Sequence, residues 1–170
     1  MKVKRQFSQD EIFEFRNKLL KTKRPEENIF LLDFLLNTGM RISEISNLKV
    51  ENVNFQNYNI QFLGKGDKIR HLRISKKFTL NISIYVNHRK MFPNDLIFPK
   101  STRNYQFIFE NVGIPAPHGF RHHYAITILQ KTKNIKYLQS QLGHASINTT
   151  AKFYLSFMDF DQENEKLEEL

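Results

Sequence analysis

The sequence contains no cysteine, and this absence excludes several kinds of site at once. The chain cannot form a disulfide scaffold, bind a metal through thiolates or use a cysteine nucleophile. Long hydrophobic runs are also missing, because the longest, residues 29–36, is interrupted by Asp33 and is far too short to span a bilayer. The first residues turn polar before any apolar stretch, so we expect no signal peptide, a cytoplasmic location and no membrane partner.

What is present is typical of one globular domain. The 170 residues are 40% hydrophobic and 25% charged, which is the composition of a folded chain rather than a disordered one. No internal repeat, low-complexity tract or Gly/Ser linker divides the chain. A domain of this length buries roughly 70% of its unfolded surface. We therefore expect a single folded domain that is stable without covalent cross-links.

Basic residues are in excess, with 26 Lys and Arg against 17 Asp and Glu and a net charge of +9. Six of the acids follow Met158, so residues 1–158 carry 25 basic and 11 acidic side chains, a balance of +14. A compact body this basic repels itself unless it binds a polyanion, and nucleic acid is the usual one. A basic surface that only keeps the protein soluble is the alternative.

The hydrophobic pattern predicts an α+β fold that is mainly α, with a small antiparallel sheet. Ser8 and Glu11 have the spacing of a capping box at the start of a first helix, and Pro25 and Gly39 bound the second. The apolar face of the first helix would comprise Ile12, Phe13, Phe15, Leu19 and Leu20.

Further helices are expected from Ile42 and over 76–90, 102–112, 118–131, 135–142 and 148–157. A hairpin is expected from the β-type runs 58–63 and 69–74, and a brief strand over 96–98.

Two segments place arginine or histidine at predicted helix starts. In Thr-Gly-Met-Arg-Ile-Ser-Glu, residues 38–44, Arg41 lies between two helices, where backbone amides and a guanidinium can face an anion. His118 and Arg121 lie three residues apart and share one helical face. Alone, each is most often a solvated surface. Cleavage of a phosphodiester, however, needs hydrogen-bond donors around the phosphate, a nucleophile and an acid for the leaving oxygen.

A third segment, Leu142-Gly143-His144, completes a pattern that resembles the tyrosine recombinases, the phage integrase family. Arg41 resembles the first arginine motif of that family, and His118 to Arg121 its His-x-x-Arg box. Tyr154 lies ten residues after His144, a spacing similar to that of the family's nucleophile.

The basic turn over residues 64–69 resembles the hairpin that carries the catalytic lysine of the family. Lys65 is the first choice for this lysine, while Lys68 in the same turn and Lys49 nearby are the alternatives. The resemblance covers residues 38–154 with the boxes in the family's order.

The resemblance implies a role for each matching residue. Tyr154 would attack a scissile phosphate and become joined to the 3′ end of DNA, while Arg41 and Arg121 hold the non-bridging oxygens. Lys65 would protonate the 5′ leaving oxygen. The remaining roles fall to His118, as proton acceptor or phosphate ligand, to His144, as a further hydrogen-bond donor, and to Glu44, as a support behind the site.

The resemblance calls for no cofactor and no metal. His118 and His122 have a spacing of four, which zinc sites use, but no glutamate stands between them and no third ligand is evident. His122 and His123 are instead expected to be structural or to face DNA. Because a phosphotyrosyl bond conserves the energy of the broken bond, rejoining needs no ATP.

The family resemblance also implies partners and organisation. We expect double-stranded DNA as partner, a homo-tetramer on DNA that is a monomer when free, and a prokaryotic or phage-encoded protein at the nucleoid. Residues 1–158 would form the catalytic domain, and the acidic tail 159–170 would exchange between protomers or cover the basic groove.

Two questions stay open at this point. Most family members carry an additional N-terminal helical domain, whereas 37 residues precede Thr38, so the chain is either a piece of a longer integrase or a compact member. A non-catalytic DNA-binding module and a type IB topoisomerase are the alternative functions. Binding alone, however, has no need of a nucleophile.

Overall fold

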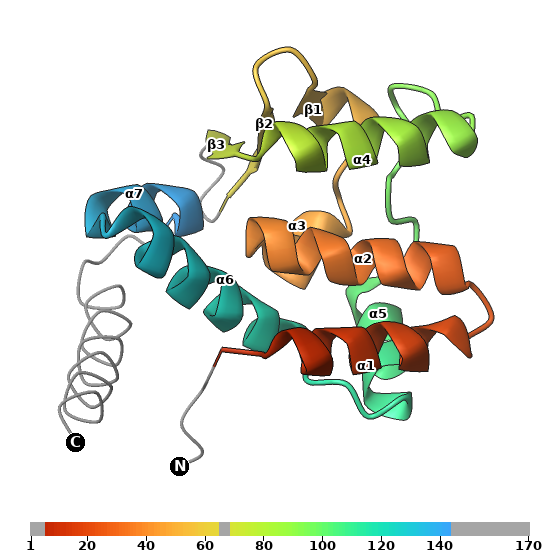
Figure 1. Ribbon diagram of the computed structural model, residues 1–170. Helices are drawn as coiled ribbons and strands as arrows, with labels where there is room; N and C mark the ends of the chain where they lie inside the picture. The colour runs from red at the N-terminus through yellow and green to blue at the C-terminus, as the bar shows by residue number, and fades with distance from the viewer. Residues whose placement is uncertain (1–5, 65–68, 144–170) are drawn as a thin grey trace, which may run out of the picture. The chain divides into compact units, whose positions relative to one another are not determined.

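The computed structural model describes residues 6–64 and 69–143 of the chain (Figure 1). These residues belong to two compact units, Met1–Tyr124 and Ala125–Leu170. Helices dominate and a small antiparallel sheet accompanies them, so the predicted mainly helical α+β class is confirmed. None of the described helices is long and apolar enough to cross a bilayer.

The first unit begins with α1 (Gln9–Leu20) and α2 (Pro25–Thr38), which pack against each other. The predicted capping box opens α1: Ser8 Oγ accepts from the amide of Glu11 at 3.1 Å, and Glu11 Oε2 accepts from the amide of Ser8 at 2.8 Å. Pro25 occupies the first turn of α2, where a missing N–H has no cost. The remaining elements of this unit are α3 (Ile42–Ile45), the 3₁₀ turn η1 (Val50–Asn52), β1 (Val53–Asn54), β2 (Asn59–Leu63), β3 (Ile69–Arg73), α4 (Lys76–His88) and α5 (Thr102–Asn111).

The sheet has the order β1-β2-β3 with antiparallel neighbours. Ile60 pairs with Leu72, and both side chains are buried, so one face of the hairpin packs on the core. The expected hairpin is confirmed. The two-residue strand β1 was not predicted, because two residues are too few to show an alternating pattern. The expected strand over 96–98 is wrong. Only Leu96 forms a bridge, with Lys49, and the residues after it are buried by packing rather than by strand pairing.

Two aromatic clusters fix the helices of the first unit. Phe34 of α2 makes edge contacts with Phe78 and Phe98 at centroid distances of 5.3 and 5.2 Å, and Phe30 stacks on Tyr85 of α4 at 3.9 Å. The second cluster gathers around Phe120 and consists of Phe7, Phe15 and Phe109. Such pairs add specific geometry to the burial of large apolar surfaces. The residue that follows Phe120 is Arg121, so this cluster positions a predicted site residue.

The predicted apolar face of α1 is correct only in part. Phe15 and Leu19 are buried, but Phe13 and Leu20 are 64% and 58% exposed. The five apolar residues span more of the helix circumference than the face that packs on α2 and on Phe120 of α6. The two exposed side chains therefore lie outside the stripe that meets the core.

Helix α6 (Pro117–Thr132) begins in the first unit and continues into the second, which also contains α7 (Ile135–Leu142). Asn134 caps α7, because its Oδ1 accepts from the amide of Tyr137 at 2.9 Å. Gly143 ends the helix in the left-handed conformation, with φ 60°. The first two residues of the Leu-Gly-His segment therefore form the C-terminal end of a helix, as the sequence predicted.

Candidate active site

The turn after α2 is shaped by Gly39. This residue ends the helix at φ 58°, a left-handed conformation that glycine adopts without strain. A Cβ atom at this position would lie 2.4 Å from Cδ1 of Tyr124 on α6, so only glycine allows the two segments to approach this closely. Thr38 fixes the same turn, because its Oγ1 donates to the carbonyl of Phe34 at 2.6 Å and accepts from the amide of Met40 at 3.2 Å.

Arg41 leaves this rigid turn and meets Glu44 at the start of α3. Its backbone amide donates to Glu44 Oε2 at 2.8 Å, and its Nη1 donates to Glu44 Oε1 at 3.0 Å. The Arg41 side chain is 44% exposed whereas that of Glu44 is 8% exposed. Glu44 therefore orients Arg41 from the protein side and leaves part of the guanidinium in contact with solvent.

Arg121 reaches the same turn from α6. Its Nη1 donates to the carbonyl of Gly39 at 2.6 Å, and the residue is buried. Desolvation by burial, followed by the positive charges of Arg41 and Arg70, lowers the pKa of Arg121 to about 10. The guanidinium thus remains charged at neutral pH while it lies beside two other cations. Such a concentration of positive charge is relieved by an anion.

Arg70 of β3 is a member of this group that the sequence did not reveal. Its Nη1 donates to Glu44 Oε1 at 3.2 Å, and burial lowers its pKa, opposed by Glu44 and reinforced by Arg41. The strand pattern did indicate its position, because Arg70 and the buried Leu72 and Ile74 occupy every second position and therefore lie on the same face of the strand. A charged side chain on the buried face of a strand indicates a specific partner.

The structure describes only some of the other predicted site residues. His118 is the second residue of α6 and is exposed. Lys65, His144 and Tyr154 lie outside the described residues, as does Lys68. Lys49, the third lysine considered, forms an ion pair with Glu51 at 3.3 Å.

His123 has a structural role. It is buried, and its Nδ1 accepts from the amide of Phe7 at 3.0 Å. Its ring also stacks on that of Phe7 at a centroid distance of 5.5 Å. Burial lowers the pKa of His123, so the ring is held in the neutral state that can accept this hydrogen bond.

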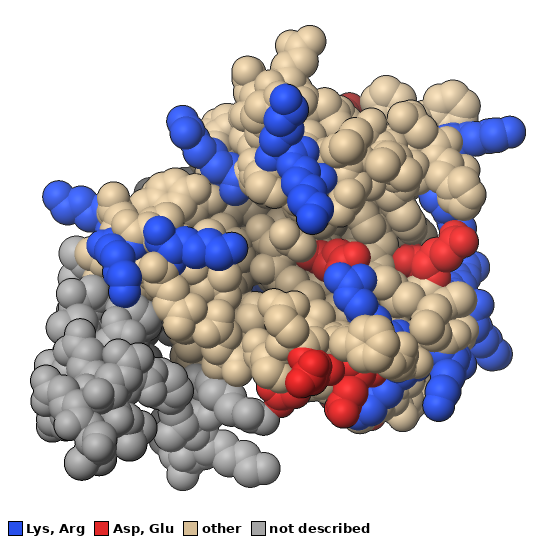
Figure 2. Space-filling view, viewed as in Figure 1, with Lys and Arg blue, Asp and Glu red and all other residues tan. Residues whose placement is uncertain are grey.

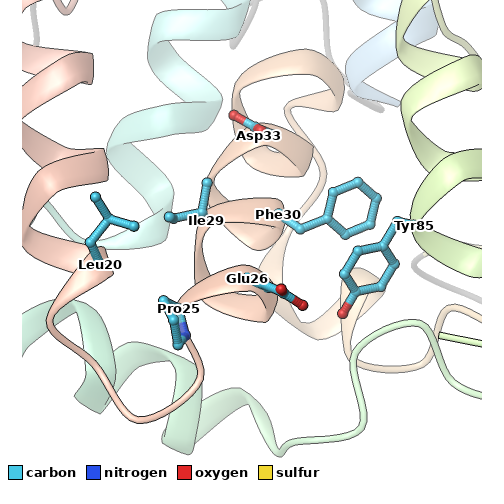
Figure 3. Close-up of a pocket in the computed structure, with 7 residues that line it drawn as sticks. All are labelled: Leu20, Pro25, Glu26, Ile29, Phe30, Asp33 and Tyr85. Atoms are coloured by element: carbon cyan, nitrogen blue, oxygen red, sulfur yellow. The ribbon is translucent and has the colours of Figure 1, made fainter. Parts of the chain in front are cut away.

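A surface cavity of about 520 Å³ lies away from these arginines. Its lining is mainly apolar and comes from the end of α1, from α2 and from α4 (Figure 3). The residues are Leu20, Pro25, Glu26, Ile29, Phe30, Asp33 and Tyr85. None of these lining residues is basic, so the lining offers no cationic group for a phosphate.

Basic side chains are frequent on the described surface. Figure 2 shows Lys and Arg spread over much of the face in view, with Asp and Glu in smaller groups. Positive charge on the described surface is therefore not confined to the cluster of arginines.

Comparisons with known proteins show the family that the motifs resemble. Residues 5–159 match the model of the phage integrase family. A tyrosine recombinase of Pseudothermotoga lettingae is 31% identical over 159 residues, which cover 85% of this chain and 55% of the relative. Tyrosine recombinase XerA of Pyrococcus horikoshii is 34% identical over 137 residues, which cover 71% of this chain and 47% of that relative. The chain thus spans about half the length of the curated relatives it matches.

Solved structures of recombinases and integrases have a similar fold. The XerH site-specific recombinase bound to a palindromic difH substrate, in a post-cleavage complex, has a TM-score of 0.74 and is 26% identical, covering 99% of this chain and 54% of that one. The catalytic domain of bacteriophage HP1 integrase has a TM-score of 0.68 at 20% identity, and the match covers 88% of this chain and 86% of that one. At this identity the likeness concerns the fold alone. With its fold, its motif order and a family match over nearly its whole length, the chain belongs to the phage integrase family.

Proposed function

We propose that this chain is the catalytic portion of a tyrosine site-specific recombinase, which cuts and rejoins double-stranded DNA. The observation that supports the proposal most strongly is the meeting of Arg41 and Arg121 at the Gly39 turn. Two guanidiniums from separate segments, the turn before α3 and helix α6, suit the non-bridging oxygens of a phosphate, and Glu44 holds the first of them.

The proposed reaction conserves atoms and charge. The phenol oxygen of Tyr154 attacks phosphorus, the P–O5′ bond breaks, and a 3′-phosphotyrosyl bond forms. Lys65 gives a proton to the departing 5′ oxygen, and His118 accepts the phenol proton. Attack by a 5′-hydroxyl on the phosphotyrosine reverses the step and joins the strands. A phenol with a pKa of about 10 needs such cationic neighbours to react at neutral pH.

Arg41 and Arg121 are assigned to the charge that develops in the transition state, with His144 as a further donor. Removing one fixed donor of this kind commonly costs about 10²- to 10³-fold in rate. Glu44 is assigned to hold Arg41, as its two contacts with that residue suggest.

The organisation of the active protein is part of the proposal. Residues 1–158 would be the catalytic domain, residues 159–170 an acidic tail that contacts a neighbouring protomer or the basic groove, and the working form a tetramer on DNA. Such a reaction takes place on chromosomal or mobile DNA, which places the protein in the cytoplasm with the nucleoid. Support comes from the relatives named tyrosine recombinase and from the XerH structure bound to its difH substrate.

Covalent trapping tests the proposal. Nicked fragments of the DNA that flanks the coding sequence serve as substrate, because a short 5′ segment diffuses away after cleavage and prevents rejoining. We expect a DNA-linked protein band for the wild type, none for Tyr154→Phe, and an unchanged band for the control Tyr137→Phe. A second arm uses the chain together with any coding sequence that adjoins it. DNA binding without a covalent band in both arms would contradict the proposal and favour a non-catalytic binding module.

A further inference from the structure

Glu44 is shared by two arginines from different parts of the fold. Its Oε1 accepts from Nη1 of Arg41 at 3.0 Å and from Nη1 of Arg70 at 3.2 Å, while Oε2 accepts from the amide of Arg41 at 2.8 Å. Three donors therefore hold one carboxylate that is 8% exposed. A carboxylate bound at both oxygens has little freedom to rotate.

Arg70 is the more firmly held of the two arginines. Its side chain is 15% exposed, compared with 44% for Arg41. It lies on β3 opposite Phe62 of β2, and its guanidinium carbon is 4.9 Å from the centroid of the Phe62 ring. Packing on an aromatic face adds a cation–π contact to the ion pair. Arg70 thus joins the β2–β3 hairpin to the start of α3.

We infer that Arg70 is a positioning residue for strand cleavage, which holds Glu44 so that the Arg41 guanidinium stays available to the scissile phosphate. This inference rests on the proposed function. Arg70 acts through Glu44 and Arg41, and it is distinct from the six residues assigned above to the reaction itself.

The physical reason is the division of one negative charge between two cations. With Arg70 in place, Arg41 satisfies only part of the charge of Glu44 and keeps donors for a second anion. Without Arg70, the whole carboxylate pairs with Arg41, which then approaches a neutral, closed pair. The positive potential at Arg121 falls as well, because the charge of Arg70 also acts on that guanidinium. A displacement of about 1 Å in such a group can cost roughly 10²-fold in rate.

The experiment compares Arg70→Met and Arg70→Lys with the control Arg73→Met. Arg73 lies on the same strand with opposite parity, so the control removes an equal charge from the other face of the hairpin. Two nicked duplexes carry the DNA site recovered by trapping with the wild type. One has the natural scissile phosphate, and the other has a methylphosphonate, in which a methyl group replaces one charged oxygen.

We expect Arg70→Met to cleave the natural phosphate about 10- to 100-fold more slowly than the wild type in single turnover. Its affinity for DNA should change far less, and Arg73→Met should cleave normally. On the methylphosphonate the defect should largely disappear, because a substrate without that charge has less need of Arg41. Arg70→Lys should recover part of the rate, and Arg70→Met should add nothing to the defect of Arg41→Met.

Other outcomes would overturn the inference. An equal loss on both duplexes would assign Arg70 to the stability of the fold, and additive defects with Arg41→Met would assign it a direct contact with phosphate. If Arg70→Met fails to fold, Arg70→Lys decides in the same way, because it keeps the charge but not the planar fork. A wild type that traps no DNA would instead reject the proposed function, so the two failures are distinguishable.

Discussion

At the scale of single residues, Gly39 carries several requirements at once. It ends α2 in a left-handed conformation, leaves room for Tyr124 and offers its carbonyl to Arg121. We predict that Gly39→Ala lowers the free energy of unfolding by about 2 to 4 kcal/mol, the sum of the left-handed strain and the overpacking. Urea denaturation measures the change.

Gly119 provides the matched control for this substitution. It lies inside α6, where an added Cβ would meet Cζ of Phe7 at 3.4 Å and Cβ of Pro115 at 3.6 Å, which the surroundings can accommodate. Gly119→Ala should therefore leave stability within about 1 kcal/mol of the wild type, on the stabilising side, because alanine favours helix. Equal losses for both variants would show that Gly39 has no special role.

Some single residues could be predicted from the sequence and others could not. The capping box of Ser8 and Glu11 and the helix end at Gly39 depend on neighbours in the chain, so local pattern was enough. The partnership of Arg70 with Glu44 depends on strand register and on a contact 26 positions away in sequence, which no local rule specifies.

At the scale of elements, Glu27 joins α2 to the segment that leads into α5. This buried carboxylate pairs with Lys100 and Arg24 and accepts from Tyr105 Oη at 3.1 Å. Burial alone would raise the pKa of Glu27, but the hydrogen bond and charge of Lys100, with Tyr105 and Arg24, lower it below its ordinary value of 4.5. The interactions of Glu27 with Lys100, Arg24 and Tyr105 are therefore strongest when Glu27 is ionised.

We predict that Glu27→Gln costs about 2 to 4 kcal/mol of unfolding free energy at neutral pH, because it leaves Lys100 without its buried counter-charge. In the wild type this contribution is fully present above pH 4.5 and is lost as the pH falls through the lowered pKa of the folded state. Unfolding curves for both proteins between pH 3 and 7 test this. Parallel curves would contradict it.

The contact between α6 and the segment before α1 has its own pH dependence. His123 has an ordinary pKa of 6.5, which burial lowers in the folded state, so the unfolded chain takes up the proton first. Stability is therefore greatest above pH 6.5 and decreases as the pH falls from there to the lowered pKa. We predict that His123→Gln removes this part of the slope, as measured by urea titrations between pH 5 and 8. A slope equal to that of the wild type would show that His123 titrates normally.

Element boundaries show where sequence patterns are sufficient. Helices with clear start and stop signals, such as Pro25 and Gly39 for α2, have the predicted ends. The segment after Leu96 looked like a strand because it is apolar, but Phe98 is buried by Phe30 and Phe34 rather than by a neighbouring strand. Short apolar runs identify burial without identifying its form.

At the scale of the whole molecule, charge and motif order carried the functional prediction, and the fold agreed with it. The basic excess indicated a polyanion, and the ordered boxes indicated the family to which the chain belongs. Neither could supply the geometry of the site, because Arg41, Arg70 and Arg121 come together only through the packing of α2, α6 and the hairpin.

The most direct test of the central claim is to identify the residue joined to DNA. The trapped complex is digested with nuclease and protease, and the remaining adduct is mapped by mass spectrometry. We predict a peptide in which Tyr154 carries a nucleotide through a 3′-phosphoryl bond, and no adduct from Tyr154→Phe. An adduct on another residue, or one joined through a 5′ phosphate, would contradict the assignment of this chain as a tyrosine recombinase that works through Tyr154.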